Sequence, residues 1–122
     1  MRTLLLFASM MAAGTTAAAA TPELARSEIG HLLHAVESSG CKFNRNGSWH
    51  DAKAARQHLE KKFAYLDKRD LAPTAEQFIE RGAANSSSSG KPYQMQCAGK
   101  APVTSSAWLR AELTRYRGQG KS

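Results

Sequence analysis

The dipeptide Asn46-Gly47 restricts what this chain can fold into more than any other feature of its sequence. A two-residue type I′ turn needs positive φ at both central residues, and Asn followed by Gly adopts that conformation most readily. The short segments on either side are prone to form strands, so we predict a β-hairpin. Strand alternation then places Cys41, Phe43 and Arg45 on one face of it.

The predicted hairpin consists of residues 42–45 and 48–50, and a helix should follow it directly. Asp51 has the side chain of a helix N-cap, with Ser48 as the alternative if the second strand is short. Residues 52–66 then show the apolar periodicity of a helix. The hairpin is therefore expected to lead straight into this helix.

Capping residues and apolar periodicity predict three further helices. The first has Thr21 as its N-cap and ends near Gly40. Another begins at Thr74, which has capping-box spacing with a later glutamine. The last begins at Ser105 or Ser106, either of which could be its cap.

A third strand is predicted over residues 92–97, between a serine-rich loop at 85–91 and another loop at 99–103. The fold class that follows is α+β, with about four helices packed on a small antiparallel sheet made of the hairpin and this third strand. We expect residues 21–117 to form one globular domain and residues 118–122 a flexible tail.

The N-terminus has the pattern of a secretion signal. Arg2 supplies a positive charge, residues 4–13 form an apolar run, and Ala18 to Ala20 fits an A-x-A cleavage site. We therefore expect cleavage after Ala20, a periplasmic location, and no membrane span in the mature chain.

Cys41 and Cys97 are the two cysteines of the chain. An even number of cysteines in an oxidising compartment favours a disulfide, and both cysteines share a face with buried-type residues of their predicted strands. A redox or metal site is the alternative, but neither cysteine lies in a C-x-x-C motif. We predict one structural disulfide.

The chain is basic, with a formal net charge of +7. Such a balance implies attraction to anionic partners. For an exported protein we expect an anionic cell-envelope polymer or another periplasmic protein, and no nucleic acid. The sequence indicates no cofactor.

The candidate ligand-binding residues are Arg45, Trp49, His58 and Ser89. A guanidinium beside an aromatic ring suits an anionic or sugar ligand, which favours Arg45 with Trp49 across the hairpin. His58 flanks the apolar stripe of its helix, where it could act as a general base. The alternative is that Trp49 is core, Arg45 is solvated, and His58 bonds a backbone carbonyl.

His31 and His34 have a spacing that can hold a metal, but they lie opposite the apolar stripe of the first helix and lack a third ligand. We expect both to be exposed and predict no metal site. Ser88 to Lys91 matches the S-x-x-K of serine acylases, although Gly90 and Pro92 argue against the helix that this chemistry needs.

The stretch Cys41-x-Phe43-x-Arg45-Asn46-Gly47-x-Trp49 resembles DUF5329, a family of small exported bacterial proteins of unknown function. The likeness continues in Glu28-Ile29-x-x-Leu32-Leu33, Ala55-x-x-His58-Leu59-x-x-Lys62, Phe78-Ile79, Ser86-x-x-Ser89-Gly90-x-Pro92-Tyr93 and Trp108-Leu109-x-x-x-Leu113. The resemblance implies a periplasmic protein of one domain and no activity. Arg45, His58 and Ser89 fall on family motif positions, with no role assigned to them.

These observations favour a non-enzymatic periplasmic binding or accessory domain, for a cell-envelope component or another exported protein. The alternative is a small periplasmic hydrolase acting on cell-wall material, with His58 as general base. A nucleophile or a set of metal ligands beside His58 would distinguish the two, and the sequence displays neither.

Overall fold

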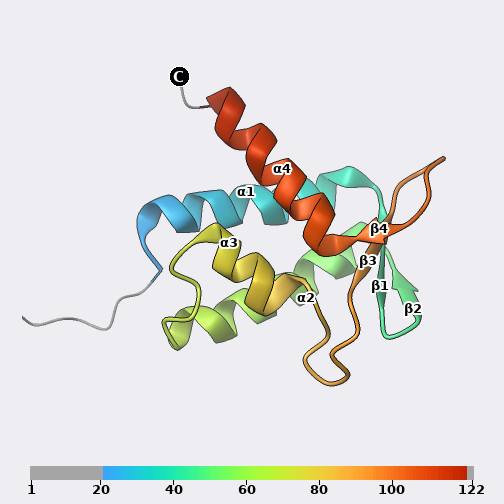
Figure 1. The fold of residues 1–122 in the computed structure, drawn as a ribbon, viewed down its shortest axis with the longest axis horizontal. Coiled ribbons are helices and arrows are strands. Elements are labelled where there is room, and N and C mark those ends of the chain that lie inside the picture. Colours follow the sequence, from blue (N-terminus) through green and yellow to red (C-terminus); the bar gives the residue numbers. More distant parts are fainter. Residues whose placement is uncertain (1–20, 121–122) are drawn as a thin grey trace, which may run out of the picture.

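The computed structural model of this protein describes residues 21–120 (Figure 1). The predicted secretion signal in residues 1–20 lies outside the described residues, as do residues 121–122. The elements in chain order are α1 (Glu23–Ser39), β1 (Lys42–Arg45), β2 (Ser48–His50), α2 (Ala52–Lys68), α3 (Ala75–Phe78), the π-helix η1 (Ile79–Ala83), β3 (Gln94–Gln96), β4 (Val103–Thr104) and α4 (Ser105–Gly120).

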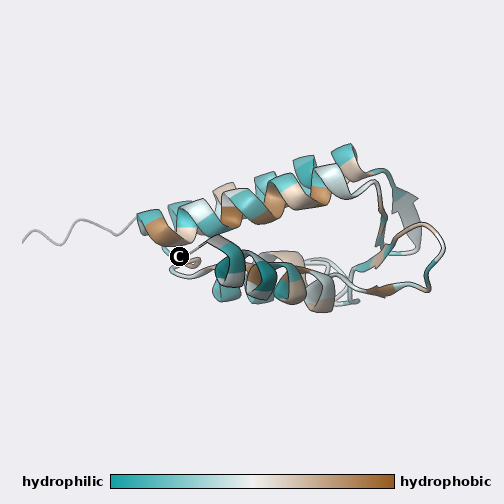
Figure 2. Cartoon of the chain, turned by 90° about the horizontal axis from the view of Figure 1, so that it is seen from above, coloured by the Kyte–Doolittle hydropathy of each residue, from teal (hydrophilic) through white to brown (hydrophobic). Residues whose placement is uncertain are grey.

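The helices pack on one another, and the small sheet lies at one end of them (Figure 1). In Figure 2 the apolar residues, in brown, lie mainly on the inward sides of the helices, and the hydrophilic residues, in teal, face outward. The predicted α+β fold class is confirmed, including the four α-helices and an antiparallel sheet.

The sheet has four antiparallel strands in the order β2-β1-β3-β4. Phe43 of β1 lies opposite His50 on one side and Met95 on the other, and Met95 pairs with Val103. Phe43 and Met95 are buried, so this row faces the core at the two inner strands, whereas Val103 at the edge is 45% exposed. Strand β4 was missed, because residues 99–103 were predicted to form a loop.

The core combines the apolar stripes of the helices with the inner face of the sheet. Its buried members are Ile29, Leu32, Leu33, Val36, Cys41, Phe43, Ala55, Leu59, Leu66, Ala72, Ala75, Phe78, Ile79, Ala83, Tyr93, Met95, Leu109 and Leu113. Every helix and both inner strands contribute, so burial of one continuous apolar cluster holds the helices against the sheet.

The hairpin and the start of α2 form as predicted. Asn46 has φ 52° and Gly47 has φ 89°, the two positive values that a type I′ turn requires. The Asp51 carboxylate accepts a hydrogen bond of 2.8 Å from the backbone N–H of Ala54, so Asp51 is the N-cap. The orientation of α2 relative to the hairpin is thereby fixed locally.

Two of the predicted caps are wrong by one residue. Helix α1 has Pro22 as its N-cap, without a side-chain capping bond, and the backbone N–H of Thr21 instead donates to Asp67 at 3.0 Å. At α4, Thr104 accepts from the backbone N–H of Ala107 at 3.2 Å. Ser105 is buried and donates to the carbonyl of Ala83 at 2.6 Å, which joins α4 to η1.

Helix α4 continues to Gly120, so residues 118–120 of the predicted flexible tail are helical. Thr74 caps α3 as predicted, accepting from the backbone N–H of Gln77 at 3.1 Å. In η1, a Cβ added to Gly82 would lie 2.9 Å from Cδ1 of Leu66. A glycine at this position therefore allows η1 to approach α2 closely.

The predicted disulfide between Cys41 and Cys97 is present, with 4.2 Å between the Cα atoms. It joins the residue before β1 to the residue after β3, two strands that are already paired. The disulfide therefore closes one end of the ladder at the centre of the sheet.

Candidate functional site

A pocket of about 310 Å³ lies between the hairpin, α2 and the serine-rich loop. Its lining consists of polar and basic side chains: Arg45, Asn46, His58, Lys62, Ser86, Ser87, Ser88 and Tyr93. We call it the basic pocket. Three segments that are distant in sequence contribute to it, and the fold brings them together.

His58 is part of this lining and precedes the buried Leu59 on α2. Its Nε2 is 2.9 Å from the Tyr93 hydroxyl. Burial, aided by the charges of Arg45 and Lys62, lowers the pKa of His58 to about 4. The imidazole is therefore neutral at neutral pH, and its partner is a side-chain hydroxyl rather than a backbone carbonyl.

Lys62 follows His58 by one helical turn and faces the same pocket. Its ammonium donates to Ser87 Oγ at 2.6 Å and to the Tyr93 hydroxyl at 3.3 Å. Burial and the charge of Arg45 lower the pKa of Lys62. Burial also raises the pKa of Tyr93, which keeps its hydroxyl protonated and able to donate.

Hydrogen bonds between the hairpin turn and the serine-rich loop hold the pocket wall in place. The Asn46 amide donates to Ser86 Oγ at 3.1 Å and accepts from Ser89 Oγ at 2.5 Å. Within the loop, the backbone N–H of Gly90 donates to the carbonyl of Ser86 at 2.9 Å. Ser89 thus supports the wall through Asn46 without lining the pocket itself.

A second pocket of about 460 Å³ adjoins the basic pocket and shares His58, Lys62 and Ser87 with it. The residues that line the second pocket alone are Lys61, Tyr65, Leu66 and Arg81. We call it the adjoining pocket. The two pockets together form one depression along α2.

The depression carries positive charge that the protein does not neutralise. No acidic side chain lines either pocket within the described residues. Arg45, Lys61, Lys62 and Arg81 form no ion pair within residues 21–120, whereas the ion pairs of the arginines found there involve Arg26, Arg56, Arg115 and Arg117. An anion would be attracted to such a site.

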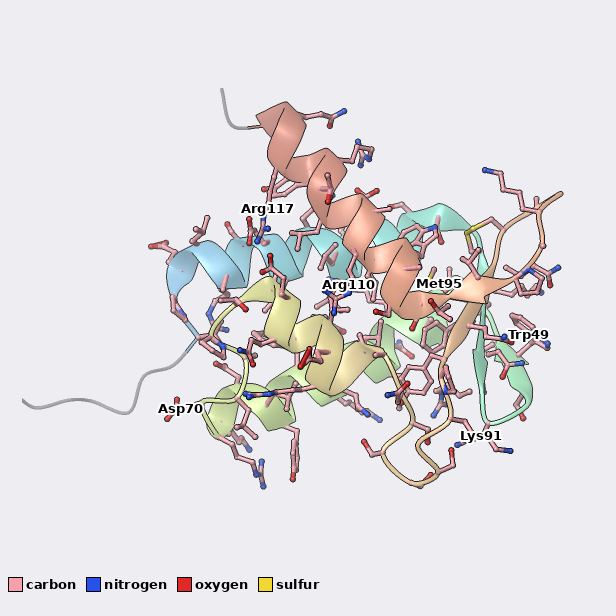
Figure 3. All side chains as sticks on the ribbon, in the orientation of Figure 1. Trp49, Asp70, Lys91, Met95, Arg110 and Arg117 are labelled. Atoms are coloured by element: carbon pink, nitrogen blue, oxygen red, sulfur yellow. A yellow bond between two sulfur atoms is a disulfide. The ribbon has the colours of Figure 1, made fainter. Side chains whose placement is uncertain are left out.

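The structure places Arg45 and His58 in the lining of the same pocket but leaves Trp49 outside it. The expected pairing of Arg45 with Trp49 across the hairpin is wrong, because Arg45 lies opposite Ser48 and Trp49 lies opposite Asn44. Trp49 is 42% exposed, so it is not core either, and it extends outward from the hairpin in Figure 3.

The sequence reasoning missed Lys62, Ser87 and Tyr93 as lining residues. The spacing of four between His58 and Lys62 was a usable signal, because residues so spaced share a helix face. The position of Ser87 depends on how the loop folds back on the hairpin turn, which no local pattern reveals.

His31 differs from its predicted exposure. Its Nε2 lies 2.6 Å from Glu112 Oε2, and its ring stacks on Tyr116 with 3.9 Å between centroids. Helix α4 covers this side of α1, which makes His31 half-buried, whereas His34 is exposed as expected. Within residues 21–120, no three His, Cys, Asp or Glu residues are grouped to hold a metal ion.

These features define a small α+β protein with one disulfide and a basic pocket beside its hairpin. The chain belongs to DUF5329, a family of unknown function, whose model matches residues 23–117. It is similar to the uncharacterized protein YfeK of Salmonella typhimurium (strain LT2), with 39% identity over 66 residues. That match covers 53% of this chain and 53% of the relative.

No solved structure matches the chain. None of the helices in residues 21–120 has the length and apolar character needed to cross a membrane.

Proposed function

We propose that this protein is located in the periplasm and that its basic pocket binds an anionic group of a cell-envelope component. The observation that supports the proposal most strongly is the gathering of Arg45, Lys62 and serine hydroxyls in a concave site without a carboxylate. The planar guanidinium of Arg can donate two parallel hydrogen bonds to an oxyanion, and the ammonium of Lys supplies a compact positive charge.

The electrostatics of the site favour a bound anion. Arg45 and Lys62 each disfavour the protonated form of His58, and Arg45 disfavours the charged form of Lys62. An anion bound among these groups would offset the repulsion between the positive charges. Its attraction to them would be stronger in this partly buried site than in bulk water. Ser87 and Tyr93 line the same pocket and add hydroxyl groups to it.

The location is part of the proposal. The pattern of residues 1–20 favours export with cleavage after Ala20. The Cys41–Cys97 disulfide is compatible with an oxidising compartment. There, an anionic polymer or another periplasmic protein could present the bound group, and the volume of about 310 Å³ suits a single charged group better than a protein surface.

Calorimetric titration with inorganic sulfate tests the binding, because sulfate does not change its charge near neutral pH. We expect saturable binding to the parent protein, and a loss of about tenfold or more in affinity for Arg45→Gln and for Lys62→Gln. Arg110→Gln is the matched control, because Arg110 is exposed on α4 and lines neither pocket. Equal sulfate affinity in all four proteins would place the site elsewhere.

A hydrolase is the second candidate, and one contact favours it. Lys62 Nζ lies 2.6 Å from Ser87 Oγ, and the pKa of Lys62 is lowered, as in enzymes that pair a serine nucleophile with a lysine base. His58 bonds Tyr93 and not a serine, so Lys62 is the better placed base for Ser87.

A fluorophosphonate reagent tests the hydrolase, because it labels activated serines covalently. A hydrolase acting on cell-wall material through Ser87 should gain the mass of one adduct, and Ser87→Ala should gain none. Ser88→Ala is the control, since Ser88 lines the same pocket but does not bond Lys62. An unlabelled parent protein would exclude this mechanism.

A further inference from the structure

We propose that the ligand of the depression is an alkyl phosphate, with its phosphate in the basic pocket and its alkyl chain in the adjoining pocket against Tyr65 and Leu66. This inference rests on the proposed function and specifies the class of its ligand. It begins from the continuity of the two pockets, which share His58, Lys62 and Ser87.

The α2 helix places polar and apolar side chains in order along the depression. Tyr65 and Leu66 follow Lys62 by three and four residues, so they lie one turn further along the same side of the helix. A ligand whose phosphate contacts Lys62 can therefore extend an apolar group along α2 toward Tyr65.

Tyr65 gives the adjoining pocket an exposed apolar surface that is already ordered. The residue is 56% exposed, and the Arg69 guanidinium lies 3.7 Å from its ring centroid. This cation–π contact restrains the ring before a ligand binds, which lowers the ordering cost of binding. Contact with the ring would remove apolar surface of both the ligand and the protein from water.

The remaining walls suit a flexible chain better than a flat ring. Lys61, Lys62 and Arg81 contribute long aliphatic stems, and the buried Leu66 also lines this pocket. Arg81 is held by its own hydrogen bond of 2.9 Å to the carbonyl of Leu71, so its stem forms a fixed border. Together with the Tyr65 ring, these stems can contact a chain along its length.

The charge at the rim excludes cationic ligands and disfavours neutral ones. Lys61 and Arg81 border the adjoining pocket, just as Arg45 and Lys62 border the basic pocket. An uncharged alcohol of the same chain length would leave all four cations without a counter-charge. The combination of apolar surface with a cationic rim thus specifies an amphiphilic anion.

Calorimetric titration of the full chain with methyl, hexyl and phenyl phosphate tests the inference, because these monoesters carry the same charged group. Burying one methylene raises affinity roughly fourfold, but the open side of the depression leaves part of the chain in water. Hexyl phosphate should therefore bind at least about tenfold more tightly than methyl phosphate. Phenyl phosphate should bind more weakly than hexyl phosphate.

Tyr65→Ala is the diagnostic variant, and its exposure makes normal folding the expected result. It should weaken hexyl phosphate binding by about threefold to tenfold and leave methyl phosphate binding unchanged. Trp49→Ala is the matched control, because Trp49 is an exposed aromatic residue that lines neither pocket, and it should change neither affinity.

Each failure has a distinct meaning. Equal affinity for methyl and hexyl phosphate would overturn the alkyl ligand and leave anion binding intact. Tighter binding of phenyl than of hexyl phosphate would overturn the proposal of an alkyl chain and favour an aromatic group in the adjoining pocket. Equal losses for both alkyl esters in Tyr65→Ala would overturn the placement of the alkyl chain against Tyr65. The absence of binding by any phosphate or sulfate would overturn the proposed function as well.

Discussion

Arg117 near the end of α4 donates two hydrogen bonds to Glu28 of α1, at 2.8 and 2.9 Å. The same guanidinium also bonds Glu76 of α3, at 2.7 and 3.1 Å. Three helices therefore meet at one side chain, which is labelled in Figure 3. Because Glu28 is only 4% exposed, its charge depends strongly on such contacts.

Replacing Arg117 by Ala should destabilise the fold by about 1–3 kcal/mol, because it removes charge-assisted hydrogen bonds to a buried carboxylate. Denaturant unfolding measures the change. Arg115→Ala is the control, since Arg115 is 52% exposed and pairs with Glu112 within its own helix, and it should cost less. An Arg117→Ala protein as stable as Arg115→Ala would show that the three-helix contact contributes little.

Reducing the disulfide, or replacing both cysteines by Ala, should destabilise the protein by roughly 4 kcal/mol. The sequence separation of 56 residues between Cys41 and Cys97 sets this value, because the cross-link restricts the unfolded chain. Thermal unfolding with and without reductant measures it. A midpoint that reductant leaves unchanged would contradict the prediction, provided that mass spectrometry confirms reduction.

Gly47→Val should destabilise by on the order of 1–3 kcal/mol, because a β-branched side chain is strained at the φ of 89° found there. No atom lies within 4 Å of the added Cβ, so backbone strain is the expected cause. Gly30→Val is a comparison at a helical glycine whose added Cβ is equally unobstructed. Equal thermal midpoints for Gly47→Val and the parent would show that the turn tolerates the residue.

Stability should fall as the pH decreases from about 6.5 toward 4, because the unfolded state binds a proton at His58 before the folded state does. The folded pKa is about 4 and the unfolded value is 6.5, so the stabilisation from neutral His58 is complete above pH 6.5. Because the site is partly solvated, we expect a loss of about 1–2 kcal/mol.

Urea unfolding across this pH range measures the loss, and His58→Gln should remove it. The basic groups that face the imidazole are Arg45 from β1, His50 from β2, and Lys61 and Lys62 from α2. Every other residue is the same in both proteins, so the difference between the two curves reports His58. Parallel curves would mean that His58 titrates normally in the folded protein.

Local chemistry was enough to predict the hairpin, the Asp51 cap and the overall fold class. Each depends on neighbours in sequence or on the alternation of apolar residues. Strand β4 escaped prediction because Val103 and Thr104 are exposed, and they form a strand only through pairing with β3. The environment of His31 escaped it for a similar reason, since α4 approaches α1 from another part of the chain.

The candidate site was predictable only in part. Arg45 and His58 were chosen for their chemistry, and the structure places both in one lining, although their binding role stays a prediction. Trp49 was chosen as their neighbour, but strand register separates it from them. Ser89 supports the pocket wall through its hydrogen bond to Asn46. This contact could not be predicted from the sequence, because it depends on how the serine-rich loop packs against the hairpin turn.

Every side chain that lines the two pockets lies between Cys41 and Cys97 in the sequence. The exposed serine-rich loop lies inside the same interval, where a protease could reach it. A single cut there would give two fragments that remain covalently joined, with the paired strands β1 and β3 beside the link. A nicked molecule would thus migrate as one species on a non-reducing gel, with the residues that line both pockets still in one covalent unit, and as two species after reduction.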